Sequence, residues 1–159
     1  MNRSGPELAL LLLAGFRSMV DAGTAELAKR GHPDVRASHD FAMRAIIAGA
    51  DSAGELGRRL SVSKQAAAKT IIVLEERGYI TREVDAVDSR RKQLVVTPRG
   101  LNLLETGQEI FDGIWEQWQE RIGVEALAIL QNSLRTVVGG STDSLDTFGW
   151  LVRTSGAPG

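Results

Sequence analysis

The part of the chain that decides the fold is residues 52–100, which read SAGELGRRLSVSKQAAAKTIIVLEERGYITREVDAVDSRRKQLVVTPRG. Ser52 and Glu55 match the capping-box pattern, so a short helix is expected to begin there. A tight turn follows at 61–63, and a second helix then runs on until Gly78, a residue typical of helix C-termini. The apolar spacing assigns buried positions to Leu56, Leu60, Ala67, Ile71 and Leu74. The first half of the stretch therefore predicts a helix-turn-helix.

The second half predicts a β-hairpin. Residues 79–85 alternate like a strand, residues 92–97 are again rich in β-formers, and the turn 86–91 between them is charged. Thr97 and Pro98 then fit the N-cap and first position of another helix. A helix pair followed directly by a basic-tipped hairpin suits duplex DNA, because the second helix fits the major groove and the hairpin reaches the adjacent backbone or minor groove.

Long amphipathic segments flank this stretch. Helices are expected at 6–30 and 36–48 before it, and from 98 to about 122 and from 124 to 138 after it. The apolar run 8–16 lacks the flanks and cleavage site of a signal peptide and is too short to cross a membrane. A cytoplasmic protein without a membrane partner is therefore expected. The tail 141–159 is expected to be partly flexible, with local docking of its aromatic residues.

Composition excludes several classes of protein. The chain has 159 residues, no cysteine and two histidines. Disulfides, thiolate catalysis and thiol redox sensing are thus excluded, and neither a metal site nor a cofactor is expected. No nucleophile elbow or phosphate loop indicates an enzyme. The net charge is −1, yet 58–99 holds ten of the nineteen bases and five of the twenty acids, which indicates a local anionic partner.

Six positions of the second helix lie away from its apolar face and are the candidate DNA-reading residues. Ser63 and Lys64 suit phosphates, Gln65 can pair with adenine, and Lys69 can reach guanine or phosphate. The two alanines could contact a thymine methyl. The full set is Ser63, Lys64, Gln65, Ala66, Ala68 and Lys69. The alternative is that Ser63 only caps the helix and Lys64 is only solvated.

The hairpin tip supplies four further candidates. Arg90 is the preferred minor-groove residue, and Asp88 is placed to hold its guanidinium by a charge-assisted hydrogen bond. Arg91 and Lys92 would contact phosphates. The alternative interpretation is an ordinary solvated turn.

These motifs resemble one family. The stretch DSRRKQLVVT at 88–97 resembles the wing signature D-x-R-x(5)-L-T of MarR-type (multiple antibiotic resistance regulator) transcription factors, with Val96 in place of the leucine. Residues 97–100 (TPRG) look like the T-x-x-G that follows it, and 62–65 and 74–80 resemble the recognition helix and its exit. Ile72 and Val73 depart from the family, which often has charged residues there.

The resemblance implies a mainly α fold with a small β-hairpin wing: a winged helix-turn-helix at 36–99, flanked by long N- and C-terminal dimerisation helices at 1–35 and 100–140. The apolar stripes of the long helices independently favour a homodimer, since they exceed what one small domain can cover. A twofold dimer predicts a pseudo-palindromic operator.

The resemblance also implies a small-molecule effector held between the dimer helices and the winged helix. Phe16, Arg17, His39, Met43 and Trp115 are the candidates, and an aromatic lining with one cation suits an aromatic acid. Plain core packing is the simpler interpretation of these side chains.

The expected function is that of a sequence-specific transcriptional regulator of duplex DNA. Repression is the usual outcome in the family. The rival hypothesis is a winged-helix module that binds protein, for which the basic wing would be incidental.

Overall fold

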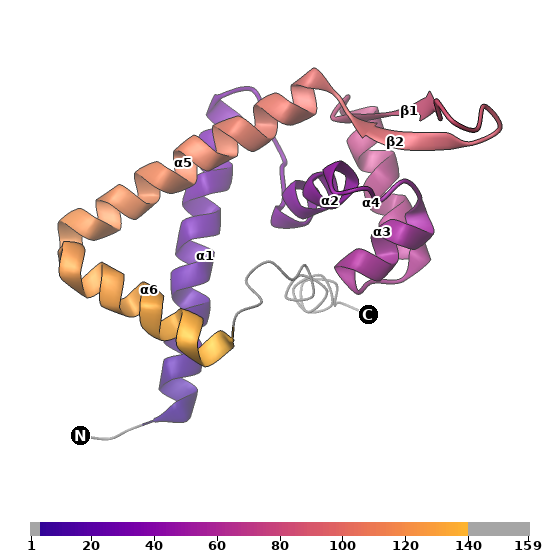
Figure 1. Ribbon diagram of the computed structural model, residues 1–159. Coiled ribbons are helices and arrows are strands. Elements are labelled where there is room, and N and C mark those ends of the chain that lie inside the picture. Colours follow the sequence, from indigo (N-terminus) through magenta and orange to yellow (C-terminus); the bar gives the residue numbers. More distant parts are fainter. Residues whose placement is uncertain (1–3, 140–159) are drawn as a thin grey trace, which may run out of the picture.

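The computed structural model describes residues 4–139, which form six helices and one hairpin (Figure 1). In chain order the elements are α1 (Gly5–Lys29), α2 (Ala37–Ile47), α3 (Ala53–Leu60), α4 (Lys64–Glu76), β1 (Ile80–Val84), β2 (Lys92–Val96), α5 (Pro98–Ile122) and α6 (Val124–Val138). The predicted fold class is confirmed. The expectations for the tail 141–159 lie outside the described residues.

The helix ends lie where the sequence signals place them. The Ser52 hydroxyl accepts the backbone N–H of Glu55 at 3.2 Å, and the Thr97 hydroxyl accepts that of Gly100 at the same distance. Each bond satisfies one of the free N–H groups at a helix start. Gly78 ends the second helix of the pair with a φ of 73°, which costs an L-residue more than glycine.

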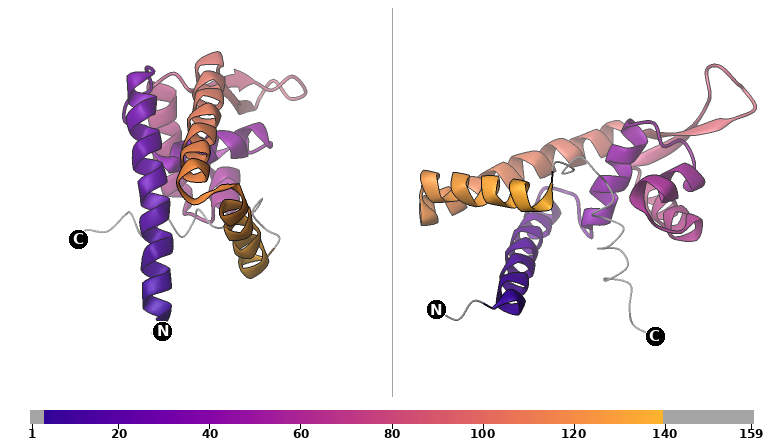
Figure 2. Two further views of the ribbon diagram at one scale, coloured as in Figure 1. Left: turned by 90° about the vertical axis from the view of Figure 1, so that its left-hand side faces the viewer. Right: turned by 60° about the horizontal axis from the view of Figure 1, so that its bottom comes forward.

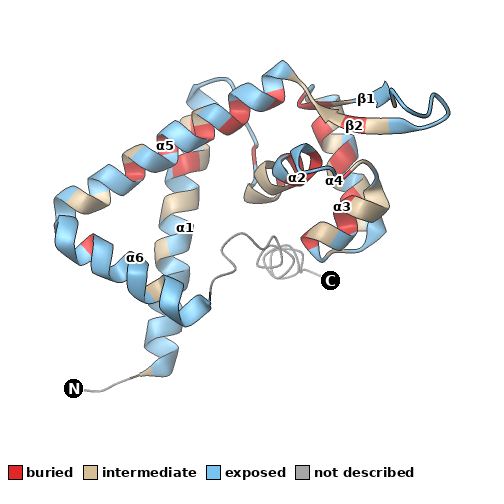
Figure 3. Ribbon diagram, viewed as in Figure 1, coloured by how far each residue is buried: buried red, intermediate tan, exposed pale blue. Residues whose placement is uncertain are grey.

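The winged helix holds the core. The largest fully buried side chains come from α2, α3, α4 and the start of the hairpin: Met43, Leu56, Ile71, Leu74 and Tyr79. We call the part from α2 to β2 the head. Buried positions cluster in the head and where α5 meets it, while the N-terminal half of α1 and most of α6 are exposed (Figure 3). Of the two isoleucines that end α2, Ile46 is buried and Ile47 is exposed.

The hairpin packs on α5 through a very close approach. β1 and β2 pair antiparallel with Ile80 opposite Val96, and Thr97 donates its backbone N–H to the Tyr79 carbonyl. A Cβ on Gly100 would collide with that carbonyl and lie 2.6 Å from Val96 Cγ1. The glycine of the TPRG motif is therefore required by packing between the sheet and the start of α5.

A buried polar network joins the head to the long helices. His32 Nδ1 lies 3.1 Å from the Tyr79 hydroxyl and Nε2 lies 2.9 Å from Asn102 Oδ1. Because an amide oxygen only accepts, Nε2–H donates to Asn102 and Nδ1 accepts from Tyr79. The Arg99 guanidinium stacks over the Tyr79 ring at 4.9 Å and donates to the Gly31 carbonyl. The loop after α1, the entry to β1 and the start of α5 are thus held together.

The long helices cross beside the head and project away from the wing (Figures 1 and 2). Gly15 and Gly23 of α1 face Trp118 and Phe111 of α5, so the two helices approach closely. By length and composition α1 could also cross a membrane, because its apolar window extends well beyond the run 8–16. The same exposed leucines can equally cover a second helix layer.

Candidate nucleic-acid interface

Gly57 allows the turn between α3 and α4 to approach α3 closely. A Cβ at this position would lie 3.0 Å from the Val62 carbonyl oxygen, and the Val62 N–H donates to the Gly57 carbonyl at 2.9 Å. Ser61, in the left-handed region with a φ of 53°, reverses the chain between α3 and α4. This turn fixes α4 as the second helix of the pair, with its first residues at the molecular surface.

Helix α4 has one buried and one open face. Its apolar face, which buries Ala67, Ile71 and Leu74, packs into the head as predicted. Ser63 caps the helix, since its hydroxyl accepts the Ala66 N–H at 3.1 Å. Of the remaining predicted DNA-reading residues, Lys64, Gln65 and Lys69 are exposed, while Ala66 and Ala68 are half-buried at the edges of the open face. The predicted set therefore forms one surface.

Two aspartate side chains stabilise the turn at the wing tip by accepting hydrogen bonds from backbone N–H groups. The Asp85 carboxylate accepts the backbone N–H groups of Val87 at 2.8 Å and Asp88 at 3.4 Å. These hydrogen bonds hold the pKa of Asp85 below its ordinary value. The Asp88 carboxylate accepts the backbone N–H of Arg90 at 3.0 Å. The prediction that Asp88 holds the Arg90 guanidinium is therefore wrong, because this carboxylate binds the main chain.

Arg91 is also placed differently from the prediction that it meets phosphates. Its guanidinium donates to the Asp51 carboxylate at 3.0 Å, which ties the wing to the loop before α3. A second ion pair, between Arg82 and Glu75 at 2.8 Å, ties β1 to α4. Two ion pairs thus link the hairpin to its neighbours, one to the loop before α3 and one to α4.

The unpaired cations of the helix-turn-helix and the hairpin, residues 52–100, lie on α4 and the wing. Arg58 and Arg59 pair with Glu55, whereas Arg77 and Arg99 donate to backbone carbonyls. Between residues 52 and 100, four basic side chains have neither an ion pair nor a side-chain hydrogen bond: Lys64, Lys69, Arg90 and Lys92. All four are exposed and all were predicted as DNA-binding residues.

Sequence reasoning missed Asp51 and Asp85. Asp85 carries a local signal, because an aspartate at the start of a turn commonly accepts the backbone N–H two residues further on, as in an Asx turn. Asp51 carries none, since its partner Arg91 is forty residues away in the sequence.

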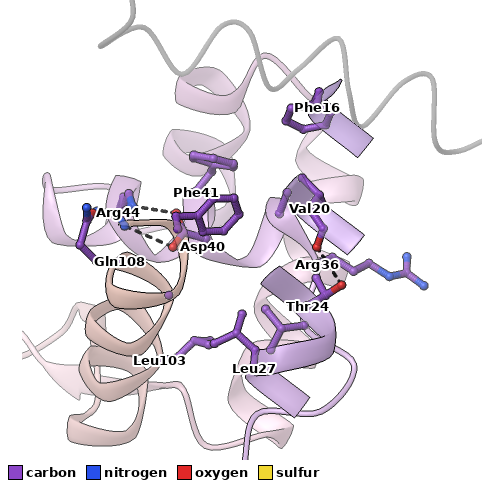
Figure 4. A pocket seen from close by; sticks show the side chains of 14 residues that line it. Phe16, Val20, Thr24, Leu27, Arg36, Asp40, Phe41, Arg44, Leu103 and Gln108 are labelled. Carbon is purple, nitrogen blue, oxygen red and sulfur yellow. Dashed lines mark hydrogen bonds and ion pairs between the residues drawn. The ribbon is translucent and has the colours of Figure 1, made fainter. Parts of the chain in front are cut away.

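A separate pocket of about 280 Å³ lies between α1, α2 and α5 (Figure 4). Its lining is mostly apolar, and Phe16, Phe41 and Phe111 contribute aromatic rings. Asp40 and Arg44, which also line it, neutralise one another through a 2.7 Å ion pair. The Arg36 side chain points away from the cavity (Figure 4).

Only one of the predicted effector residues lines this pocket. Phe16 does so, whereas Met43 is fully buried in the head core and His39 lines a second, more polar hollow with Arg36 and Arg77. Arg17 and Trp115 lie on the exposed surfaces of α1 and α5 and are outside both linings.

Residues 42–91 match the sequence profile described as the MarR family. They span the core of the helix-turn-helix, β1 and the wing tip. This segment of the chain is therefore similar to the MarR family. The resemblance predicted from its motifs is confirmed.

A relative is also found among curated proteins. The HTH-type transcriptional regulator SarZ of Staphylococcus haemolyticus (strain JCSC1435) is 30% identical over 88 residues, which cover 55% of this chain. The chain matches 58% of the length of that relative.

Solved structures share the fold over most of the chain. One S. aureus MepR variant has a TM-score of 0.66, at 18% identity, over 86% of this chain and 97% of its own. A second S. aureus MepR variant has a TM-score of 0.58, at 19% identity, over 82% of this chain and 95% of its own. The second of these is bound to an oligodeoxyribonucleotide. CouR from Rhodococcus jostii RHA1, bound to p-coumaroyl-CoA, has a TM-score of 0.59 at 17% identity over 86% and 95%.

Proposed function

We propose that this protein is a sequence-specific transcriptional regulator that binds duplex DNA through α4 and the wing. The observation that carries the proposal is the position of the four unpaired cations, all on the open face of α4 or at the wing tip. Lysines near the start of α4 can approach phosphates while Gln65 faces a base edge, and Arg90 at a fixed tip can enter the neighbouring minor groove. The DNA-bound MepR structure has the same fold.

The described residues also support a homodimer as the active form. Exposed apolar side chains of α1 and α6 form surfaces too large for a small monomer to leave in water; they include Leu8, Leu10, Leu11, Leu12, Leu13, Ile129, Leu130, Val137 and Val138. A second copy is the occupant we favour, because α1, α6 and the C-terminal part of α5 extend away from the wing and leave the DNA face open (Figure 2).

The dimer is tested by light scattering of the wild type and of Leu12→Asp. The wild type should have twice the monomer mass, and the variant should shift toward the monomer. Binding of the wild type to lipid vesicles, with monomeric protein in solution, would instead assign the leucines of α1 to a membrane. That result would contradict the proposed cytoplasmic dimer.

DNA binding is tested by selecting bound duplexes from random fragments, followed by titrations against salt. Each neutralised phosphate contributes about −0.9 to the slope of log K against log salt, so four free cations in each protomer of a dimer predict a slope of about −7. Arg90→Ala should lower this slope and the affinity, whereas Arg121→Ala, which removes an exposed arginine at the far end of α5, should leave both unchanged. Equal affinities of the two variants would refute the wing assignment. Absence of any duplex binding would favour the protein-binding alternative.

We further propose that the protein is a repressor that an uncharged aromatic ligand releases by occupying the pocket of Phe16, Phe41 and Phe111. The sequence favours an aromatic acid. In the pocket, however, Asp40 and Arg44 neutralise one another, and the Arg36 side chain points away from the cavity (Figure 4). A matched pair of probes, 2-naphthol and 2-naphthoate, tests the charge preference by the shift in Tm. A larger shift with 2-naphthol supports the neutral pocket, and a larger shift with 2-naphthoate restores the acid. Operator release by the bound probe tests repression.

A further inference from the structure

We propose that Ile72 contacts the methyl group of a thymine at the rim of the major groove, and so sets the base preference at one position of each half-site. This inference rests on the proposed function, because it requires α4 to lie in the groove. It concerns a residue that the sequence left with two interpretations, packing on the strands or a weaker hold on phosphates.

Ile72 belongs to the open face of α4. It is 52% exposed, whereas its neighbour Ile71 is 1% exposed in the core. Gln65, Lys69 and Ile72 follow one another at spacings of four and three residues, so they form a single stripe along the helix. The stripe that begins with a candidate base reader therefore continues into an isoleucine.

Nothing inside the described chain accounts for an isoleucine here. The side of α4 toward the wing is already bridged by the ion pair of Glu75 and Arg82 at 2.8 Å. A β-branched residue is also a weaker helix former than the charged or straight-chain residues that an exposed helix position accepts. The absence of an internal role favours an external apolar contact.

The distance along the helix identifies that contact. Ile72 is the ninth residue of α4, about 12 Å along the axis from Lys64 at about 1.5 Å per residue. When the N-terminal residues of α4 contact the base edges, this distance equals about one width of the major groove, about 12 Å, and places Ile72 near the rim. The thymine methyl is the apolar group that a base pair presents in this groove, and it projects toward the side of its own backbone. An isoleucine gains from that methyl and gains nothing from a phosphate oxygen.

Replacement of thymine by deoxyuridine tests the contact, because deoxyuridine lacks only the methyl group. Each thymine of the selected operator is replaced in turn and the affinity is measured. Wild-type protein should lose about fourfold in affinity at one thymine per half-site, as expected from about 0.8 kcal/mol for one buried methyl-sized group. Ile72→Ala should bind both duplexes equally, and Ile72→Val should retain most of the discrimination.

Ile47→Ala is the matched control, since it removes the same atoms from a residue that is 57% exposed on α2. This variant should discriminate the two bases like the wild type. The inference is overturned if no thymine is sensitive to the replacement, or if Ile72→Ala keeps the wild-type discrimination. Failure of the wild type to bind any unmodified duplex is a separate result, because it removes the proposed DNA binding itself.

Discussion

Acidification should destabilise this protein through one histidine. His39 is buried at the start of α2, where its Nδ1 accepts the backbone N–H of Arg36 at 3.2 Å. Burial, followed by the charges of Arg77 and Arg36, lowers the pKa of His39 from 6.5 to about 4. Asp34 is the acid that lines the same hollow as His39. A proton on Nδ1 would also remove the acceptor that caps the helix.

The sign and size of the effect follow from proton linkage. Between about pH 6.5 and pH 4 the unfolded chain binds a proton at His39 that the folded chain does not. The contribution of His39 to the free energy of unfolding is therefore constant above this window and falls as the pH decreases through it. The full difference is about 3 kcal/mol, of which about 2 kcal/mol is lost by about pH 4.5.

Urea unfolding at about pH 7 and about pH 4.5, at one fixed protein concentration, measures the loss. His39→Gln is the comparison variant, because glutamine at this position can still accept the capping N–H and does not titrate. The carboxylates contribute equally to both proteins, so the difference between wild type and variant isolates His39. An identical loss of stability in the two proteins would refute this account of the buried histidine.

Three further substitutions have effects that the packing predicts, each measured by urea unfolding. Gly100→Ala should lower the free energy of unfolding by about 3 kcal/mol, the upper end for overpacking, because the new Cβ would collide with the Tyr79 backbone and with Val96. Unchanged stability would mean that α5 can move away from the sheet. Gly107→Ala should stabilise by about 1 kcal/mol, since its Cβ enters open space in a helix interior, and a loss of stability would count against that geometry. Tyr79→Phe should cost about 2 kcal/mol by leaving His32 Nδ1 buried without its hydroxyl partner, and a neutral result would show that the hydroxyl bond contributes nothing.

The elements of the fold could be predicted because their signals are local. Ser52, Ser63 and Thr97 each cap a helix within three residues of the group they bind, and Gly78 ends one. The core face of α4 followed from helical spacing alone. The place of Met43 was harder to predict. Helical spacing shows that an apolar residue faces inward, but it does not distinguish the core of the head from the wall of a pocket.

The site could be predicted only in part, since its main corrections are long-range or depend on backbone geometry. The sequence shows that Asp88 stands two residues before Arg90, but the direction of its carboxylate depends on the path of the turn. The hydrogen bond between Arg91 and Asp51 forms only when the hairpin lies beside the loop before α3, so the local sequence does not indicate it. The four free cations were nevertheless all predicted, because exposed basic residues on α4 and the wing need no tertiary partner.

The acids at the wing order the tip that carries Arg90, the residue proposed to enter the minor groove. Asp85 and Asp88 direct their carboxylates to backbone N–H groups, and Asp51 takes the guanidinium of Arg91. Each acid therefore removes conformational freedom from the tip without neutralising Arg90. In the proposed complex, a tip that is already ordered loses less entropy when Arg90 enters a groove. Replacing these acids to make the wing more basic would strengthen its general attraction to DNA and loosen the geometry that places Arg90.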